Sequence, residues 1–426
     1  MVDGGGGALL PGLHDHHLHL MALAAQITSV DCGPTAVNSA EELQAVLRRS
    51  VGRQSDGWVR GIGYHESVAG HLDRALLDRM VPDAPVRIQH RGGAMWVLNS
   101  AALRLLEHGI VEGLEQTGAE RDLERDSNGR STGRLFRQDA LLARLLPARP
   151  PDLGAVGRRL RDLGITGVTD ATPDLSDGAA ALLAEAASDG RLPIKVTVLG
   201  STHPPAPLSV GPAKIMLRDH DLPNFDQFCG AVSAHRRARR PVAVHCVTRE
   251  SLILTLAVLA EVGTEPGDRI EHGAVIPGDL VPTIRDLQLR VVTQPDFLRT
   301  RGDDYLRDVD RSDLECLYPF RSLLSAGIPT VASSDAPFGE LDPWRVIASA
   351  VGRRSLRGAE LQPPERVSAS TALDGYLSPA GDPGVGTRRI AVGAEGDLTL
   401  LHVPLSVALT EPTSEAVRMT VVDGRS

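Results

Sequence analysis

The sequence predicts an α/β protein: a (β/α)8, TIM-like barrel with a small, reduced β-sandwich appendage. Short apolar runs rich in β-branched residues alternate with longer amphipathic stretches, and no GxGxxG or GxxxxGK[ST] loop follows the early runs. Such alternation is typical of a parallel sheet. The missing glycine loops favour closure into a barrel over an open, nucleotide-binding sheet. Strand patterns then return near the C-terminus without a long helix between them, which indicates the appendage.

The expected elements follow from this alternation. Candidate strands lie at Leu9–Leu13, Pro85–His90, Gly167–Asp170, Ile194–Leu199, Ala213–Leu217, Val242–Cys246, Arg269–Glu271, Arg290–Gln294 and Thr330–Ser334. Helical patterns lie between them at Ala40–Arg49, Leu153–Leu163, Gly178–Ala187, Asn224–Arg239, Arg249–Val262 and Pro319–Ala326. These patterns place the barrel at residues 9–385.

Two regions depart from the alternation. Residues near 110–152 are charged and turn-rich, and we expect a surface excursion there with a helix at Gln138–Leu146. Residues 1–8 and 386–426 would supply the sandwich strands, with strands expected at Asp397–Val403 and Val417–Gly424.

Composition excludes several classes of protein. The net charge of −9 argues against a nucleic-acid or anionic-membrane partner. No apolar run is long enough for a transmembrane helix, and the N-terminal residues lack the basic region of a signal peptide. Four widely separated cysteines form neither a CxxC motif nor a disulfide framework. We therefore expect a reduced, cytoplasmic protein.

The first candidate site residues are His17 and His19. They lie two apart at the end of a candidate strand, so both imidazoles point the same way, as two ligands of one metal require. The C-terminal end of a barrel strand faces the active-site mouth. A histidine-rich turn without function stays open, because His14 and His16 are also present.

Further candidates also end strands. His245 lies near the end of PVAVHC, His272 ends RIEH and Asp335 ends TVASSD. Each histidine alone is more often structural, and the aspartate could be a helix N-cap or turn residue instead of a metal ligand and proton shuttle. We expect Glu271 to pair structurally, for example with Arg269.

Lys214 is notable because the 45 basic residues include just two lysines, Lys195 and Lys214. Arginine cannot replace lysine where an amine must lose its proton. Lys214 lies inside a strand-like run, where desolvation favours the neutral amine. A neutral amine can take up carbon dioxide to form N6-carboxylysine, which can bridge two divalent ions. A lysine that snorkels at a strand edge is the alternative.

Taken together, these motifs resemble the amidohydrolase superfamily, specifically amidohydrolase family 3, the YtcJ-like branch that includes N-substituted formamide deformylases. The resemblance runs nearly the whole length and is most specific in LLPGLHDHHLHL (9–20) and SDAP (334–337). Other matches are WVLNSAAL (96–103), GITGVTDA (164–171), VAVH (242–245), RIEHGAVI (269–276), TQP (293–295) and GAEGDLTLLHV (393–403).

The resemblance implies one or two divalent ions, expected to be zinc, and hydrolysis by a metal-bound hydroxide. His17, His19 and Asp335 would bind the more buried ion, His245 and His272 the second, and a carboxylated Lys214 would bridge the two. Asp335 would carry the proton and His272 could polarise the substrate. A single metal would instead take His17, His19, His245 and Asp335.

Three positions depart from the family pattern. Gly93-Ala94 replaces a GH pair, Arg249 stands where aspartate is usual, and Arg137 stands where glutamate is usual. All are expected to face substrate. The two arginines suggest a substrate that carries a carboxylate, since a guanidinium binds carboxylates in a bidentate manner.

The leading function is therefore cleavage of a C–N bond in a small-molecule or peptide amide, such as an N-acyl amine or a peptide natural-product precursor. A hydrolytic deaminase of a cyclic amidine, working with one metal, is the alternative, and Lys214 argues against it. A non-catalytic binding or regulatory protein on the same fold is a third reading. Relatives usually carry further N-terminal strands; without them the appendage would expose a sheet edge, which would favour a homodimer.

Overall fold

The structure, a computed structural model, describes residues 3–52, 57–111, 123–136, 138, 142 and 151–425. The chain divides into two compact units. The larger combines Met1–Leu23 with Leu153–Ser426, and the smaller comprises Ala24–Asp152. Helix α1 (Leu20–Ile27) spans the boundary between them.

The larger unit is built on parallel strands, as the sequence predicts for an α/β protein. One four-stranded sheet has the order β11-β10-β9-β2 and a five-stranded sheet has the order β12-β13-β14-β15-β16. Their bounds are β2 Leu13–Leu18, β9 Ile165–Asp170, β10 Lys195–Val198, β11 Ser209–Val210, β12 Ala213–Ile215, β13 Val242–Cys246, β14 Arg269–His272, β15 Arg290–Thr293 and β16 Thr330–Ala332.

Backbone hydrogen bonds join the two sheets on both sides. The Lys214 N–H donates to the Leu199 carbonyl, which follows β10, at 3.3 Å. On the other side the Asp335 N–H donates to the His17 carbonyl, and the His19 N–H donates to the Ala336 carbonyl, each at 2.8 Å. These contacts bring the end of β2 beside the end of β16.

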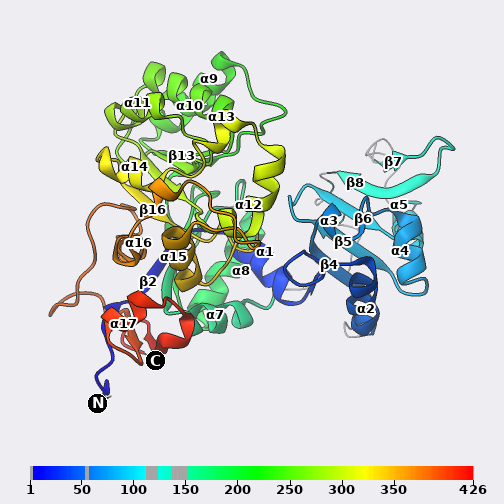
Figure 1. The fold of residues 1–426 in the computed structure, drawn as a ribbon, viewed down its shortest axis with the longest axis horizontal. Coiled ribbons are helices and arrows are strands. Elements are labelled where there is room, and N and C mark those ends of the chain that lie inside the picture. The colour runs from blue at the N-terminus through cyan, green and yellow to red at the C-terminus, as the bar shows by residue number, and fades with distance from the viewer. Residues whose placement is uncertain are drawn as a thin grey trace. The chain divides into compact units, whose positions relative to one another are not determined.

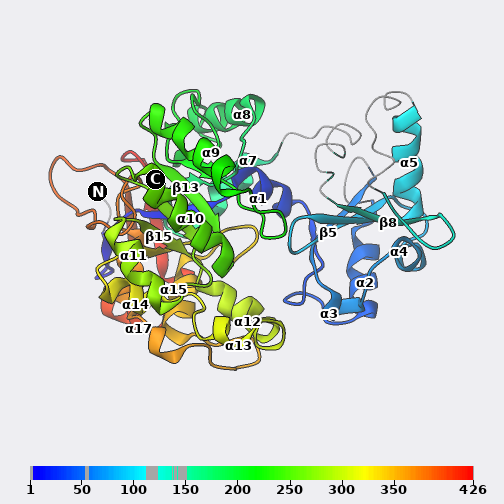
Figure 2. The ribbon, with the colours of Figure 1, turned by 90° about the horizontal axis from the view of Figure 1, so that it is seen from above.

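Helices follow most of these strands. They are α7 Leu153–Asp162, α8 Asp177–Ser188, α9 Phe225–Arg237, α10 Arg249–Val262, α11 Val281–Asp286, α12 Asp296–Asp308, α13 Arg311–Leu314, α14 Phe320–Ser325, α15 Pro343–Gly352 and α16 Ala369–Tyr376, with 3₁₀ turns at Gly278–Leu280 and Pro363–Glu365. In both views α9 and α10 lie beside β13 (Figure 1, Figure 2).

Local sequence explains where the longer helices begin. Thr248 caps α10 through a reciprocal capping box with Ser251, and Asn224 caps α9 in the same way with Gln227. Their apolar faces pack on β13–β15 in a core that includes Phe228, Val232, Val244, Leu252, Leu256, Ile270 and Val291. The hydrophobic burial of this layer holds the strand ends that carry the candidate site residues.

A small antiparallel sheet accompanies the parallel strands. Its order is β1-β17-β18, with β1 Leu9–Pro11, β17 Leu398–Leu401 and β18 Val417–Val421. The short helix α17 (Leu405–Thr410) and a 3₁₀ turn at Ser414–Ala416 lie between the last two strands. Both expected C-terminal strands are therefore present.

The smaller unit contains a six-stranded mixed sheet of order β3-β4-β5-β6-β8-β7. Its elements are β3 Val30–Asp31, α2 Ala40–Ser50, β4 Val59–Tyr64, α3 Glu66–Ala69, α4 Arg74–Met80, β5 Val86–His90, β6 Met95–Leu98, α5 Ser100–Val111, β7 Leu123–Arg125 and β8 Ser131–Phe136. Leu43, Leu47, Leu77, Val86 and Ile88 belong to its own hydrophobic core.

This unit differs from the expected domain boundaries. The strand expected at Pro85–His90 as part of the barrel pairs here with β4 and β6, and the unit begins at Ala24, well before the excursion expected near 110–152. The periodicity of a strand reports its burial and not the sheet that it joins, so the pattern could not separate the two units. The helix expected at Gln138–Leu146 lies almost entirely outside the described residues.

Among the described residues, no helix combines the length and apolar character needed to cross a membrane. All four cysteines are free.

Candidate metal centre

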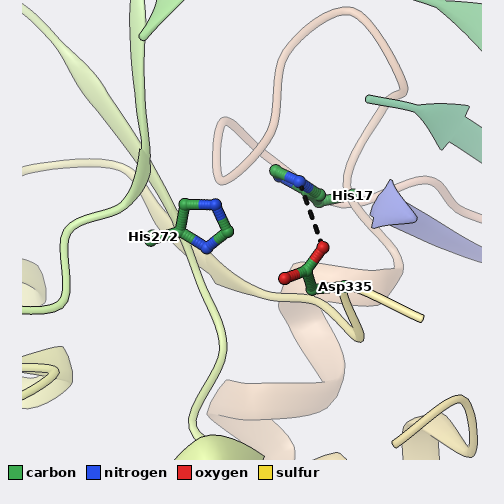
Figure 3. Close-up of side chains that lie close together, drawn as sticks. All are labelled: His17, His272 and Asp335. Carbon is green, nitrogen blue, oxygen red and sulfur yellow. Dashed lines mark ion pairs between the residues drawn. The ribbon is translucent and has the colours of Figure 1, made fainter. Parts of the chain in front are cut away.

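Side chains from three separate strand ends converge in the larger unit (Figure 3). They are His17 on β2, His272 at the end of β14 and Asp335, which follows β16. One potential ligand atom from each lies within 4.8 Å of the others, a grouping that no other His, Cys, Asp or Glu set in the described ranges matches. All three residues are buried. Nitrogen and oxygen atoms so arranged suit a divalent ion such as zinc.

The ring of His17 lies between two carboxylates. Its Nδ1 contacts Glu271 Oε2, and its Nε2 lies 3.5 Å from Asp335 Oδ1, the contact drawn as a dashed line in Figure 3. The His17 ring is 1% exposed and the Glu271 side chain is fully buried. The buried carboxylate of Glu271 thus fixes the orientation of the ring.

His19 also faces Asp335. Its Nε2 lies 3.1 Å from Asp335 Oδ1, and its Nδ1 lies 3.2 Å from Thr172 Oγ1. The ring centroids of His17 and His19 are 5.5 Å apart. Both imidazoles of the HxH pair are therefore beside the same carboxylate, where the strand alternation predicted a shared face.

His245 and His272 lie side by side at the ends of neighbouring strands. Their ring centroids are 4.4 Å apart, and the centroid of His272 is 4.9 Å from that of His17. The Nδ1 of His272 lies 2.7 Å from Gln294 Oε1. The Nδ1 of His245 is buried and has no hydrogen-bond partner in the described part of the chain. The four histidines thus extend the centre from β2 to β13.

Lys214 on β12 contributes a buried amine. Its Nζ has no hydrogen-bond partner among the residues that the structure describes. Burial lowers the pKa of this amine, although the charges of Glu271 and Asp335 oppose that shift. Buried polar atoms are normally paired, and the exceptions need an explanation. The amine of Lys214 therefore loses its proton more readily than usual, the behaviour that desolvation was expected to cause.

Two of the converging residues adopt an unusual backbone conformation. The φ angles of His272 and Asp335 are 71° and 54°, in the left-handed region that residues with a side chain seldom occupy. Such strain persists where the surrounding structure holds it in place, and it clusters at functional sites.

Electrostatic effects keep the carboxylates of the centre ionised. Burial alone would raise the pKa of Glu271, but the charge of Arg269 holds it well below its usual value. Burial likewise opposes ionisation of Asp335, yet the hydrogen bond from His19 lowers its pKa. Burial and the charge of Lys214 together lower the pKa of His245 to about 4. The imidazole of His245 is thus neutral at neutral pH, as metal binding requires.

The other histidines of the N-terminal motif have separate partners. His14 Nε2 lies 2.9 Å from Thr169 Oγ1, and His16 Nε2 lies 3.2 Å from the Gly375 carbonyl. The sequence reasoning did not identify Asp15 as a site residue. Its Oδ1 accepts from the His17 and Ser334 N–H groups at 3.1 and 3.3 Å, so it ties β2 to the residues after β16. The aspartate in the PGLHD motif was the available signal.

Gln294 and Thr172 were also not recognised as site residues. Each follows a parallel strand, β15 and β9, and each contacts a histidine of the centre. Gln294 lies in the TQP match (293–295), and both residues follow strand ends, but neutral side chains at strand ends are common in any parallel α/β fold.

Of the two arginines expected to face substrate, the structure describes one. Arg249 begins α10, and its Nε lies 3.0 Å from Asp313 Oδ1, with the side chain 32% exposed. Arg137 lies outside the described residues. The structure therefore brings Arg249 to the end of β13 but engages it in an ion pair.

Comparison with known proteins places this centre in a family. The model of the amidohydrolase family matches residues 1–426. The N-substituted formamide deformylase of Arthrobacter pascens is 28% identical over 497 residues, covering 100% of this chain and 89% of that protein. YtcJ of Bacillus subtilis (strain 168) is 24% identical over 479 residues, covering 99% and 89%.

A solved structure, an uncharacterized metal-dependent hydrolase from Pyrococcus horikoshii OT3, has a TM-score of 0.67 and 21% identity, covering 88% of this chain and 81% of that one. This likeness shows a shared fold. The match of the family model over the whole chain goes further: this chain belongs to the amidohydrolase family.

Proposed function

We propose that this metal-dependent amidohydrolase cleaves the C–N bond of an amide, with an N-acyl amine or a peptide natural-product precursor as its substrate class. The observation that carries the proposal is the convergence of His17, His272 and Asp335 within 4.8 Å. The deformylase of Arthrobacter pascens, which by its name acts on an N-substituted formamide, supports the choice of an amide.

The residues present fit a divalent ion, and we expect zinc. His17 and His272 each engage a side-chain oxygen through Nδ1, which leaves Nε2 free to act as a ligand, that of His17 for this ion and that of His272 for a second ion. Asp335 supplies an ionised oxygen, and His19 lies against the same oxygen. When bound, such an ion lowers the pKa of water and polarises a carbonyl.

A second ion would lie toward His245 and His272, with Lys214 as an N6-carboxylysine between the two ions. Two buried atoms that have no hydrogen-bond partner among the described residues support this arrangement. The Nζ of Lys214 would become the carbamate nitrogen, and the Nδ1 of His245 would be satisfied by metal ligation. With one ion, His17, His19, His245 and Asp335 would form the set, and an unmodified lysine would favour the cyclic-amidine deaminase instead.

In the reaction, water adds to the amide carbon, the C–N bond breaks and the leaving nitrogen gains a proton. Asp335 suits the proton transfer, because its carboxylate is ionised and lies at the centre of the cluster. The His19 Nε2 contact holds Asp335 Oδ1 in place. We assign Asp335 the role of accepting the proton of the attacking water and returning it to the leaving nitrogen.

We also infer that the parallel strands of the larger unit close into one barrel. The backbone hydrogen bonds from Lys214 to Leu199, and between the residues after β2 and β16, support closure on both sides. In such a barrel the centre would lie at the C-terminal mouth, where enzymes of this architecture bind substrate. The β1-β17-β18 sheet would then be the reduced sandwich.

Metal removal tests the proposed function. The protein would be dialysed against a chelator, its metal content counted by mass spectrometry, and turnover measured on N-formyl amines, N-acyl amines, dipeptides and cyclic amidines. We expect amide turnover that disappears with the metal and returns with zinc. Undiminished turnover after complete metal removal, or turnover restricted to the amidines, would overturn the proposal. A chain that binds no metal tightly would be the non-catalytic protein.

A further inference from the structure

Arg269 and Glu271 form a buried ion pair beside His17, on the side of its ring away from Asp335. Arg269 and Glu271 lie two apart on β14, so they share one face of the strand. The Arg269 Nε donates to Glu271 Oε1 at 2.6 Å, and both side chains are almost wholly buried. The other oxygen, Oε2, contacts His17 Nδ1. The three side chains thus form a chain of arginine, carboxylate and imidazole.

This chain determines which nitrogen of His17 carries the hydrogen. An ionised carboxylate can accept hydrogen bonds but cannot donate them. The contact with Glu271 Oε2 therefore requires the hydrogen to be on Nδ1 of the neutral ring. The lone pair is then on Nε2, the nitrogen 3.5 Å from Asp335. Arg269 supports this state because its guanidinium can only donate hydrogen bonds, so its Nε contact at 2.6 Å makes Glu271 Oε1 an acceptor.

His272 is supported differently. Its Nδ1 faces Gln294 Oε1, a neutral acceptor. The orientation of the amide is fixed because Gln294 Nε2 lies 3.4 Å from the Val292 carbonyl, which can only accept, and 2.9 Å from Ser333 Oγ. An anionic acceptor withdraws the ring hydrogen more strongly than a neutral amide does, so it raises the basicity of the opposite nitrogen further.

We infer that Arg269 and Glu271 act as a positioning pair that makes His17 the stronger of the two ligands, so that the ion on His17 binds more tightly than any ion held through His272. This inference rests on the proposed function for the presence of the metal. Neither residue touches substrate: Glu271 acts through His17, and Arg269 acts through Glu271.

Zinc affinity of two matched variants tests the inference. Glu271→Gln keeps the shape of the side chain but removes its charge, and its amide can donate to Nδ1 and so move the hydrogen to Nε2. Gln294→Leu removes the neutral acceptor of His272. Competition with a chromophoric chelator would measure the dissociation constant of the tightest zinc. We expect Glu271→Gln to weaken this zinc by about 10- to 100-fold. Gln294→Leu should change it much less.

The inference is overturned if Glu271→Gln leaves the tightest zinc unchanged, or if Gln294→Leu weakens that zinc as much. Glu271→Gln leaves the buried charge of Arg269 unpaired and could fail to fold. The double variant Arg269→Met, Glu271→Gln removes both charges and should show the same loss of zinc affinity.

A second measurement needs no variant and no metal. Nitrogen-15 NMR of the histidine-labelled, metal-free protein reports which ring nitrogen carries hydrogen. We expect His17 with hydrogen on Nδ1, and the opposite tautomer would overturn the inference. Because this readout is independent of turnover, a protein with the expected tautomer and zinc affinity that hydrolyses no amide would contradict the proposed function alone.

Discussion

Replacing Lys214 with methionine should stabilise the metal-free protein and lower the turnover of the metal-loaded protein. The Nζ of Lys214 is buried without a hydrogen-bond partner in the described structure, and burial lowers its pKa. A buried polar group without a partner costs about 1–3 kcal/mol of folding free energy. Methionine has a similar length and no such group, so the free energy of unfolding should rise by about that amount.

The activity should change in the opposite direction. A carboxylated Lys214 would supply ligand oxygens, and their loss should raise the barrier by about 3 kcal/mol, which corresponds to a rate at least about 100-fold lower. The pH dependence provides a further signature. Because the folded pKa is lowered, the unfolded state binds more protons between the folded pKa and the ordinary value, so wild-type stability should rise with pH in that window. The variant should lack this rise.

The assay must resolve the two units, since a chain of this kind need not unfold in one step. Hydrogen exchange of peptides from β12 and β13 in metal-free protein would report the stability of the larger unit. Lys195→Met is the matched control: the Lys195 side chain is 40% exposed, and its Nζ lies 2.9 and 3.0 Å from the carboxylates of Asp397 and Glu395. That change should neither stabilise the unit nor reduce turnover. A Lys214→Met protein that is less stable, or that keeps full turnover, would refute the reasoning.

Three further changes have defined outcomes. Asp335→Asn should lower turnover by at least about 100-fold, because it removes the ionised oxygen that faces His17 and His19; full activity with bound zinc would exclude the assigned role. Arg249→Ala breaks a partly exposed ion pair, so stability should change by at most about 1 kcal/mol. Its KM should rise for amides with a free carboxylate, and equal KM values for matched amides would remove the carboxylate hypothesis. Gly12→Ala should cost about 1–3 kcal/mol in thermal unfolding, because a Cβ there would lie 2.2 Å from buried Thr166 atoms; an unchanged melting temperature would contradict this.

Sequence reasoning located elements well where one burial pattern dominates. The strand expected at Val242–Cys246 and the helix expected at Arg249–Val262 have those bounds in the structure. It did not separate the smaller unit, because a strand such as Pro85–His90 has the same apolar pattern in either sheet. Pairing between β5 and β4 depends on long-range packing that a local pattern does not record.

The candidate site was likewise predictable in part: its main residues could be found from the sequence, but some of their contacts could not. The motif histidines and Asp335 could be found because they combine a reactive residue type with a position at a strand end. The pairing of Glu271 with Arg269 was also expected, and the structure contains it. The contact of Glu271 with His17 joins residues 254 apart in the sequence, so it depends on how β14 and β2 are placed. No spacing rule could indicate it.

The polar residues of β2 indicate that this strand serves the chemistry of the site and lowers the stability of the fold. All six of its residues, Leu13–Leu18, are buried, and the inner four are polar. Burying polar side chains is costly unless each finds a partner, and Asp15 Oδ2 and His16 Nδ1 find none in the described structure. An aliphatic strand at this position would pack with less penalty. Apolar burial elsewhere, such as the layer around α9, α10 and β13–β15, must therefore offset this cost, and pairing with β9 holds the polar strand in place.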